Sequence, residues 1–510
     1  MNMRNTLSIA AIVTLLLVMT VLGAYWWWHN REAAPSQAGL MQVDCWFKAG
    51  EDWPSSECYR MYVPENHQQA DSRLIYFPVV VFRNPHVNPN KAPILHLGAG
   101  GPGAPMYLNS EYAVQYTWKD IRTVWLDQGR DLYLIDPRGS GLAHPLLTCD
   151  TFVYEIIGLL QQNLSNEQVL RANDKIYADC ITRFKKEGID LGAYNSLSVA
   201  EDINLLREAL GIEQWVLYGV SHGAIYAQVI VNEFPKSVAA MILDSPAFLN
   251  LKPHHNYLAV TMAPYEALYH YCEKATQCDA PLDNFKERFW TLYEQFTANP
   301  VEIKVPHPDK LGKSITVLLN GNLFVETIIY GLYDKEIFDH LPTLITELEK
   351  GHTAVIAGDV SWYLAYLLDN TYGDVSGMSH HCYETIPFTD KELIKQLAQQ
   401  LPEGYIRDVG VLAAHWPDQC KLMGIKPGDE RSNKATQTDI PTLFLVGKFD
   451  TITPLRDVLE QQPNFSNSQV LSYPLSHGIL GVDECADDAT AAFLENPQAD
   501  LSQVECVTAE

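Results

Sequence analysis

The pentapeptide Gly219-Val220-Ser221-His222-Gly223 has the residue types and the spacing of a nucleophilic serine turn. In the G-x-S-x-G pattern the serine sits on a sharp, strained turn between a strand and a helix, where larger neighbours would clash. A strand-like run at 215–218 precedes the pentapeptide, and a helical pattern at 224–234 follows it. This context predicts that Ser221 is a nucleophile. The alternative is an ordinary glycine-flanked turn between a strand and a helix.

A serine hydroxyl is a poor nucleophile unless a base takes its proton. His222 is adjacent in sequence, but at such a turn its side chain should diverge from that of the serine. His477 is the better candidate because it lies in a loop just after the strand-like run 469–473. Asp450 follows the strand-like run 442–446. We predict His477 as the base and Asp450 as the carboxylate that orients it. The chain order Ser, Asp, His is that of α/β-hydrolases.

The glycine-rich run 98–103 has two interpretations. It fits G-x-G-x-x-G, the fingerprint of dinucleotide binding, but Pro102 removes a backbone donor where a pyrophosphate would be held. No strand ending in an acidic residue follows at the right distance, so we expect no cofactor. In a hydrolase, the amide of Gly101 would instead lie opposite the amide of His222. We predict that these two N–H groups form an oxyanion hole for a tetrahedral intermediate.

Strand-like and helical segments alternate through the first half of the chain, which is typical of a mostly parallel sheet. The strand-like runs are 74–77, 79–82, 93–97, 131–136, 215–218 and 240–243. The clearest helix is expected over 198–210, with Ser198 and Glu201 forming a capping box at its start and Gly211 ending it.

The alternation stops between 247 and 439, where long amphipathic helical patterns dominate, and it resumes at 442–446. The sequence therefore predicts an α/β-hydrolase fold, a mostly parallel sheet flanked by helices, with a large helical cap inserted before the last strands. The expected parts are a signal or anchor segment (1–28), a linker (29–40), the first part of the hydrolase domain (41–246), the helical cap (247–439) and the second part of the hydrolase domain (440–510).

The N-terminal segment has the pattern of an export signal. An apolar run extends from Leu7 to Leu22, and an aromatic cluster follows it. As a helix, Leu7 to Trp28 would cross a hydrocarbon core of about 30 Å, with the aromatic residues at the interface. We favour an uncleaved membrane anchor, and a cleavable signal peptide is the alternative. Either interpretation places the rest of the chain outside the cytoplasm, in a periplasm or secreted.

The cysteines agree with an exported chain. All ten follow the apolar segment, and an even number in an exported protein suggests disulfides. Pairing each cysteine with its nearest neighbour gives 45–58, 149–180, 272–278, 382–420 and 485–506, although sequence alone does not fix connectivity. A metal site is the alternative, but there is no Cys-x-x-Cys pair and no histidine at ligand spacing beside two cysteines. We therefore predict no metal.

The net charge of −26 excludes one class of partner. Nucleic-acid phosphates would be repelled rather than neutralised by such a chain. We expect no nucleic acid among its partners, and we expect a solvated acidic surface.

Four motifs together resemble the proline iminopeptidase and tripeptidyl aminopeptidase family of serine peptidases. They are Gly100-Gly101-Pro102-Gly103, Asp136-Pro137-Arg138-Gly139-Ser140-Gly141, the pentapeptide around Ser221, and Asp450-Thr451-Ile452-Thr453-Pro454. The resemblance runs from about Cys45 to Cys506, and the cysteines are similar to those of the secreted tripeptidyl-type branch. Two positions depart from the family pattern: Ala99 replaces the usual run into His-Gly-Gly, and His222 replaces a more frequent aromatic residue.

The resemblance implies an exported serine aminopeptidase that releases one to three residues from peptide N-termini through an acyl-enzyme intermediate. An exported esterase or lipid hydrolase with the same triad is the alternative, because the fold hosts many substrates. A third possibility is a membrane-tethered binding protein that has lost catalysis, and the complete set of catalytic residue types weighs against it.

An aminopeptidase must hold the ammonium group of its substrate at a fixed distance from the nucleophile. A carboxylate in the cap would do so, because charge-assisted hydrogen bonds are about twice as strong as neutral ones. The candidates are Glu326, on a helical face that runs to Tyr333, and Glu384, two residues after Cys382. A solvated surface carboxylate is the alternative at either position.

Overall fold

The computed structural model describes residues 37–48, 55–108, 128–251, 284–390 and 418–504, together with the single residues Glu111, Trp118, Trp125 and Glu392. The predicted anchor segment and the predicted pair Cys272–Cys278 lie outside these residues. Within them, no helix is both long enough and apolar enough to cross a membrane.

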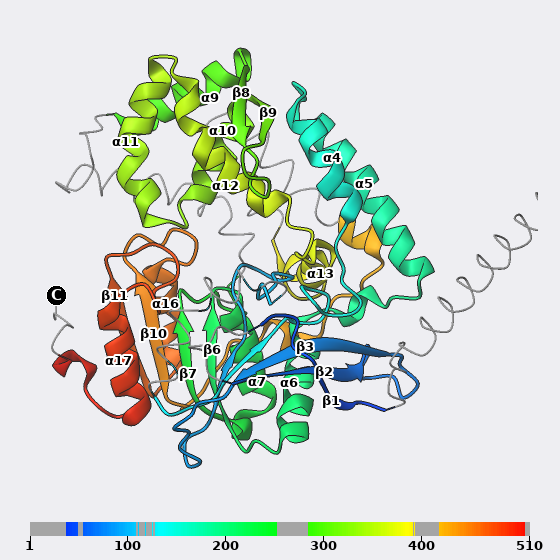
Figure 1. Ribbon diagram of the computed structural model, residues 1–510, viewed down its shortest axis with the longest axis vertical. Coiled ribbons are helices and arrows are strands. Elements are labelled where there is room, and N and C mark those ends of the chain that lie inside the picture. Colours follow the sequence, from blue (N-terminus) through cyan, green and yellow to red (C-terminus); the bar gives the residue numbers. More distant parts are fainter. Residues whose placement is uncertain are drawn as a thin grey trace, which may run out of the picture.

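A nine-stranded sheet forms the body, with strand order β1-β2-β3-β5-β4-β6-β7-β10-β11 (Figure 1). Strands β1 to β3 pair antiparallel with one another, β3 pairs antiparallel with β5, and the remaining neighbours are parallel. The strands are β1 (Gly39–Val43), β2 (Ser56–Pro64), β3 (Leu74–Phe82), β4 (Ile94–His96), β5 (Leu132–Ile135), β6 (Trp215–Val220), β7 (Val238–Asp244), β10 (Thr442–Gly447) and β11 (Ser468–Tyr473). The predicted mostly parallel sheet is confirmed.

Helices cover both faces of the sheet. The helices of the body and the cap within the described residues are α4 (Asp150–Leu160), α5 (Asn166–Lys186), α6 (Ser196–Leu210), α7 (Gly223–Glu233), α9 (Phe285–Ala298), α10 (Gly321–Gly331), α11 (Lys335–Glu349), α12 (Ala357–Leu367), α13 (Asp374–His380), α16 (Leu455–Gln461) and α17 (Glu484–Glu495). Alternate residues of β6 face different cores: Leu217 packs in the core with α6 and α7, whereas Val216 packs in the core with α17. Every residue of β6 and β10 is buried, as expected for parallel strands covered on both sides.

The start of α6 differs from the prediction. The helix begins at Ser196, and the side chain of Asn195 caps it by accepting a hydrogen bond from the Ser198 amide at 2.9 Å. The predicted capping box of Ser198 and Glu201 is therefore wrong. Asn and Ser cap helices about equally well, so the sequence pattern did not distinguish the two starts. The predicted end is confirmed, because Gly211 adopts φ +67° at the C-cap.

The cap is a separate lobe with its own core, formed by α9 to α12 and a two-stranded hairpin (Figure 1). The hairpin strands β8 (Val301–Pro306) and β9 (Ser314–Leu319) were not expected in a helical cap. Their burial alternates residue by residue, so each strand presents only a short apolar face.

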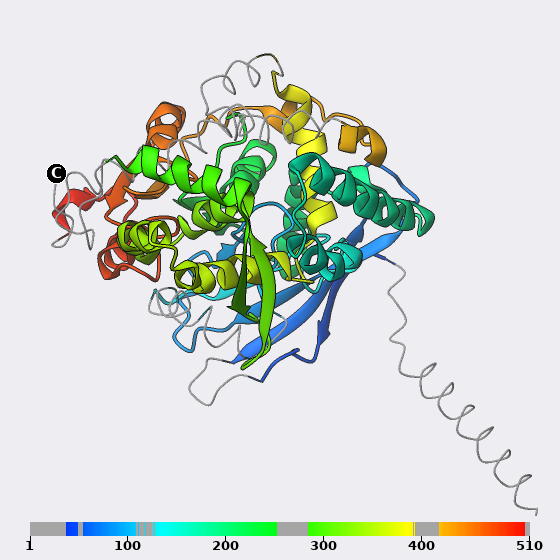
Figure 2. The same cartoon turned by 90° about the horizontal axis from the view of Figure 1, so that it is seen from above.

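The residues that form the cap core do not coincide with the inserted segment. Helix α4 precedes the insertion, yet it lies beside the β8–β9 hairpin of the cap (Figure 1, Figure 2). Its residues Ile157 and Leu160 pack against the cap core, and the Gln161 side chain donates to the Thr316 carbonyl at 3.1 Å. Conversely, Val375 and Cys382 lie within the insertion but pack in the body core. The periodicity of a helix shows that it has an apolar face, but it does not show which core that face joins.

Three of the predicted disulfides are present, Cys45–Cys58, Cys149–Cys180 and Cys382–Cys420. Cys485 is also disulfide-bonded, and its predicted partner Cys506 lies outside the described residues. Such bonds form and persist in oxidising compartments, so they indicate an extracytoplasmic protein.

Candidate active site

Ser221 lies on the sharp turn that joins β6 to α7. It has φ +54°, a conformation that costs energy for any residue with a side chain. The turn needs glycine on both sides: a Cβ on Gly219 would lie 2.5 Å from the Gly223 carbonyl oxygen, and one on Gly223 would lie 2.3 Å from that of Gly98. The strained turn fixes Ser221 at the carboxyl end of a buried strand, as its sequence context predicts.

Asp450 and His477 lie side by side although 27 residues separate them in the chain. The distance from His477 Nδ1 to Asp450 Oδ2 is 2.9 Å. The carboxylate also accepts hydrogen bonds from the amides of Ile452 at 2.9 Å and Thr453 at 2.8 Å, and from the Thr453 hydroxyl at 2.8 Å. These bonds hold the carboxylate in one orientation, and through it the imidazole.

The pairing with Asp450 affects the pKa of His477. Burial lowers its pKa, but the charge and the hydrogen bond of Asp450, with a further contribution from Asp244, outweigh burial and raise it overall. The other ring nitrogen, Nε2, is buried and makes no hydrogen bond with a described residue. A neutral His477 bonded through Nδ1–H to Asp450 has Nε2 free to accept a proton.

The glycine loop and the turn supply two backbone donors. Gly100, Gly101 and Gly103 all have φ between +84° and +87°, which only glycine adopts readily. Among the described residues, no hydrogen-bond acceptor pairs with the amide of Gly101 or that of His222. The glycine loop begins next to the serine turn, since the Val220 amide donates to the Gly98 carbonyl at 3.2 Å. Unpaired N–H groups near a nucleophile can stabilise an oxyanion.

The side chain of His222 points away from this chemistry. Its ring packs edge-on against Tyr226 with centroids 4.8 Å apart. Burial, with smaller contributions from His380 and His381, lowers the pKa of His222 well below its usual value, so the ring is neutral. This position agrees with the expectation that His222 contributes its backbone rather than its imidazole.

The segment after α12 holds the glycine loop in place. The Tyr372 hydroxyl donates to the carbonyls of Gly100 at 3.3 Å and Pro102 at 3.2 Å, and the Gly373 amide donates to the Gly103 carbonyl at 2.8 Å. The sequence did not single out Tyr372, because 270 residues separate it from Pro102.

The Asp136–Gly141 motif has a structural role. Arg138 is buried and pairs with Asp202, while Asp136 accepts hydrogen bonds from the amides of Met106 at 2.6 Å and Leu142 at 2.7 Å. These contacts fix the turn after β5 and the end of the glycine loop to each other. This motif, one of the four that resemble the peptidase family, thus supports the glycine loop.

The end of α10 lies against the His477 loop. The Tyr333 ring is edge-on to the His477 ring with centroids 5.0 Å apart, and the Ser476 hydroxyl donates to the Leu332 carbonyl. The cap therefore reaches the predicted base through the residues that follow α10. Tyr333 appeared in the sequence only as the end of a helical face.

Glu326 lies on α10 and faces the same side as Tyr330, because positions i and i+4 share a helix face. Its side chain is partly buried, and burial raises its pKa to about 7. No described residue forms a hydrogen bond or an ion pair with its carboxylate. A desolvated carboxylate without a partner is costly to keep and is typical of a binding site.

Glu384 is also buried, and burial raises its pKa to about 7, but its oxygens are occupied. Oε2 accepts from the Ser196 amide at 3.0 Å and Oε1 from the Ser196 hydroxyl at 2.6 Å. Glu384 thus neutralises the first turn of α6, where a negative charge is favourable.

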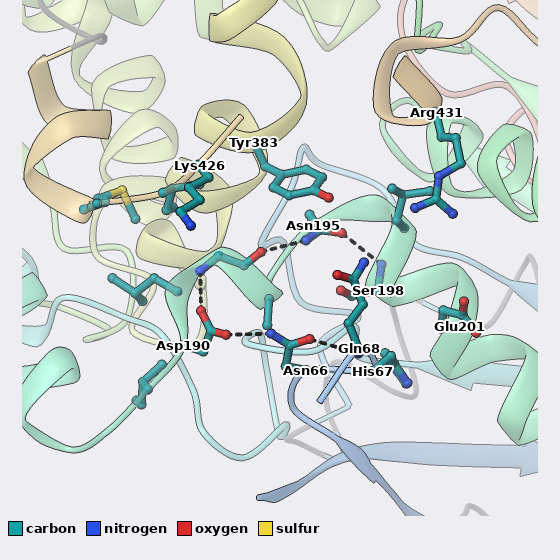
Figure 3. Close-up of a pocket in the computed structure, with 18 of the residues that line it drawn as sticks. Asn66, His67, Gln68, Asp190, Asn195, Ser198, Glu201, Tyr383, Lys426 and Arg431 are labelled. Carbon is teal, nitrogen blue, oxygen red and sulfur yellow. Dashed lines mark hydrogen bonds between the residues drawn. The ribbon is translucent and has the colours of Figure 1, made fainter. Parts of the chain in front are cut away.

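A cavity of about 540 Å³ lies beside that end of α6 (Figure 3). It is lined by His67, Asp190, Asn195, Tyr383, Lys426 and Arg431, among others, and its lining includes neither Ser221 nor His477. Two of its cations are already satisfied, since Arg431 pairs with Glu233 and Lys185 donates to the Leu422 carbonyl. We therefore place the candidate active site at Ser221 and not in this cavity.

Comparisons with known proteins agree with this geometry. Residues 101–266 match the family described as alpha/beta hydrolase fold, and residues 407–506 match the family described as TAP-like protein. The fold and these matches define the chain as an α/β-hydrolase of the serine hydrolase class.

Its relatives include named peptidases. The chain is 22% identical to the serine protease Hip1 of Mycobacterium tuberculosis, over 88% of this chain and 87% of that protein. It is 21% identical to the putative hydrolase YuaR of Escherichia coli, over 89% and 88%. It is 25% identical to the tripeptidyl aminopeptidase of Streptomyces coelicolor, over 42% and 39%. The resemblance to peptidases of the tripeptidyl aminopeptidase type is thereby confirmed.

Proposed function

We propose that this chain is an exported serine aminopeptidase that releases short pieces from the N-termini of peptides. One observation carries the choice of aminopeptidase: Glu326 is a partly buried carboxylate without a partner among the described residues, and it lies on α10, just before the residues that contact His477. An ammonium group is the partner that such a carboxylate lacks.

In the proposed mechanism, Ser221 Oγ attacks the carbonyl carbon of the scissile peptide bond while His477 Nε2 accepts its proton. The amides of Gly101 and His222 donate to the oxyanion of the tetrahedral intermediate. Protonated His477, stabilised by Asp450, then gives its proton to the departing amine, and an acyl-enzyme remains. Water attacks the ester by the same route in reverse and releases the N-terminal piece.

The length of the released piece follows from the position of Glu326. Glu326 lies five residues before Gly331, the last residue of α10, which corresponds to about 8 Å along the helix. An extended peptide spans about 3.3–3.6 Å per residue, so two or three residues bridge that distance. We therefore propose di- or tripeptide products. Glu384 is the weaker candidate for the amine site because Ser196 already occupies its oxygens.

The proposed location is outside the cytoplasm, with residues 1–28 as the export segment and as an anchor if they are not removed. The disulfides support export, because they persist in oxidising compartments.

The proposal is tested by rates on three matched substrates: a peptide amide with a free N-terminus, its acetylated form, and a short acyl ester. Acetylation removes the substrate's charge, and we expect kcat/KM to fall at least tenfold, equivalent to about 1.4 kcal/mol. Equal rates on the two peptides would contradict an aminopeptidase. A preference for the ester over both peptides would favour the esterase.

A further inference from the structure

Two residues at the end of β7, Asp244 and Ser245, contact all three loops that carry the proposed triad. The first contact is with the nucleophile turn, because the Ser221 amide donates to the Asp244 carbonyl at 3.0 Å. Both residues are fully buried.

The carboxylate of Asp244 holds the loop that carries His477. Its oxygens accept hydrogen bonds from the amides of Ile479 and Leu480, each at 3.0 Å. The Tyr218 hydroxyl donates to the same carboxylate at 3.1 Å. One residue therefore fixes the nucleophile through its backbone and the base through its side chain.

Ser245 completes the connection. Its hydroxyl accepts from the Gly478 amide at 3.0 Å, next to His477. Its carbonyl accepts from the Thr453 hydroxyl at 2.8 Å, and that hydroxyl also donates to Asp450 at 2.8 Å. Ser245 adopts φ +44°, a strained conformation for a residue with a side chain. Strain of this kind persists only where surrounding contacts enforce it, and it concentrates at functional sites.

We propose that Asp244 and Ser245 are positioning residues that set the spacing of Ser221, Asp450 and His477, and that the Asp244 carboxylate supplies a second negative charge beside His477. This inference rests on the proposed triad. Neither residue touches the substrate; they act through the loops they hold.

The second part of the proposal, the negative charge of Asp244 beside His477, can be measured through the pKa of His477. Burial raises the pKa of Asp244, and the amides of Leu480 and Ile479, then His477 and Tyr218, oppose that rise. Tyr473, Asp483 and Asp487 are the other titratable groups whose charges act in this region. His477 itself faces Asp450 and Tyr333 as well as Asp244. Asp244 and Asp450 are the two groups that raise the pKa of His477.

The test is Asp244→Asn, measured as kcat, KM and the pH profile of kcat/KM. The side-chain amide is nearly the same shape but uncharged, and its NH2 group cannot accept from a backbone N–H. We expect kcat to fall about 10–100-fold, as for small misplacements of catalytic groups, with KM within twofold. Without the charge, the pKa of His477 falls, so the acid limb of the profile moves to lower pH.

The matched control is Asp374→Asn. Asp374 also accepts from two backbone amides, Cys149 and Val375, and from a tyrosine hydroxyl, Tyr177, but it does not contact the triad loops. We expect this variant to lose stability while its acid limb stays in place. If Asp244→Asn behaves in the same way, with an unmoved limb and unchanged kcat per folded molecule, the inference is wrong.

Ser245→Gly decides the question if Asp244→Asn does not fold. Glycine tolerates φ +44° and removes only the hydroxyl that accepts from Gly478. We expect a several-fold loss of kcat at constant KM, and an unchanged kcat would overturn the positioning role. Ser221→Ala separates this inference from the triad itself: if that variant keeps its activity, the proposed function fails first.

Discussion

Carboxylates of the body and of the cap differ in whether they have hydrogen-bond partners. In the body, Asp450 accepts hydrogen bonds from Thr453 and Ile452 as well as binding His477, and Asp244 accepts from two amides and a hydroxyl. In the cap, Glu326 has no partner among the described residues. The body is thus preorganised before substrate arrives, whereas the cap holds one group whose charge the substrate would satisfy. This contrast supports the proposal that the body carries the chemistry and the cap selects the substrate.

The largest expected effect comes from removing the nucleophile in the body. Ser221→Ala should lower kcat by about 10⁶-fold and abolish labelling by a fluorophosphonate probe, while circular dichroism shows an unchanged fold. The nearby Ser245→Gly variant, which keeps the nucleophile, should still be labelled. Labelling that survives in Ser221→Ala would mean that a different residue is the nucleophile.

Removing the disulfide at the edge of the sheet and removing the one in the segment that connects the cap should lower the unfolding free energy by different amounts. Cys45–Cys58 closes a separation of 13 residues and Cys382–Cys420 one of 38. Removing either pair by serine substitution should cost about 2–5 kcal/mol of unfolding free energy. Removing the disulfide that closes the longer loop should cost about 1 kcal/mol more, because the unfolded chain then gains more conformational entropy. Chemical denaturation measures both, and an equal or reversed order would contradict this account of the two loops.

Glu326→Gln should affect substrate choice and leave the chemistry intact. We expect kcat/KM on free-amine peptides to fall at least tenfold, about 1.4 kcal/mol, with no change on acetylated peptides. Glu384→Gln is the matched control, since its carboxylate has the same raised pKa of about 7 but binds Ser196. The reverse result, a loss only in Glu384→Gln, would move the amine site to Glu384.

The smallest expected effect is on stability. The folded-state pKa of Glu326, about 7, lies above the ordinary value of 4.5, so the folded state is penalised once pH rises through that range and the group ionises. Glu326→Gln should therefore raise the unfolding free energy by about 1–2 kcal/mol at pH 8, after discounting for partial exposure, and by almost nothing at pH 4. Calorimetry at both pH values measures this difference, and destabilisation at pH 8 would show that the carboxylate has a partner.

The sequence predicted the residue types at the site because they follow local patterns. The serine turn, the strand before Asp450 and the strand before His477 each lie within a few residues of the group they position. Asp244 and Ser245 were missed because their contacts reach up to 236 residues along the chain, to Leu480. The sequence singled out Glu384 but not its partner Ser196, which is 188 residues away. The β8–β9 hairpin was missed because its short alternating strands were read within a helical region.

The most direct test of the central claim is to map products from an unblocked ten-residue peptide by mass spectrometry over time. The proposed site, with Glu326 about 8 Å from the end of α10 along the helix, predicts successive release of two- or three-residue pieces from the N-terminus. Acetylating the same peptide should suppress these products at least tenfold. Cuts at internal bonds, or the same products at the same rate from the acetylated peptide, would contradict the claim that the cap reads the substrate's amino terminus.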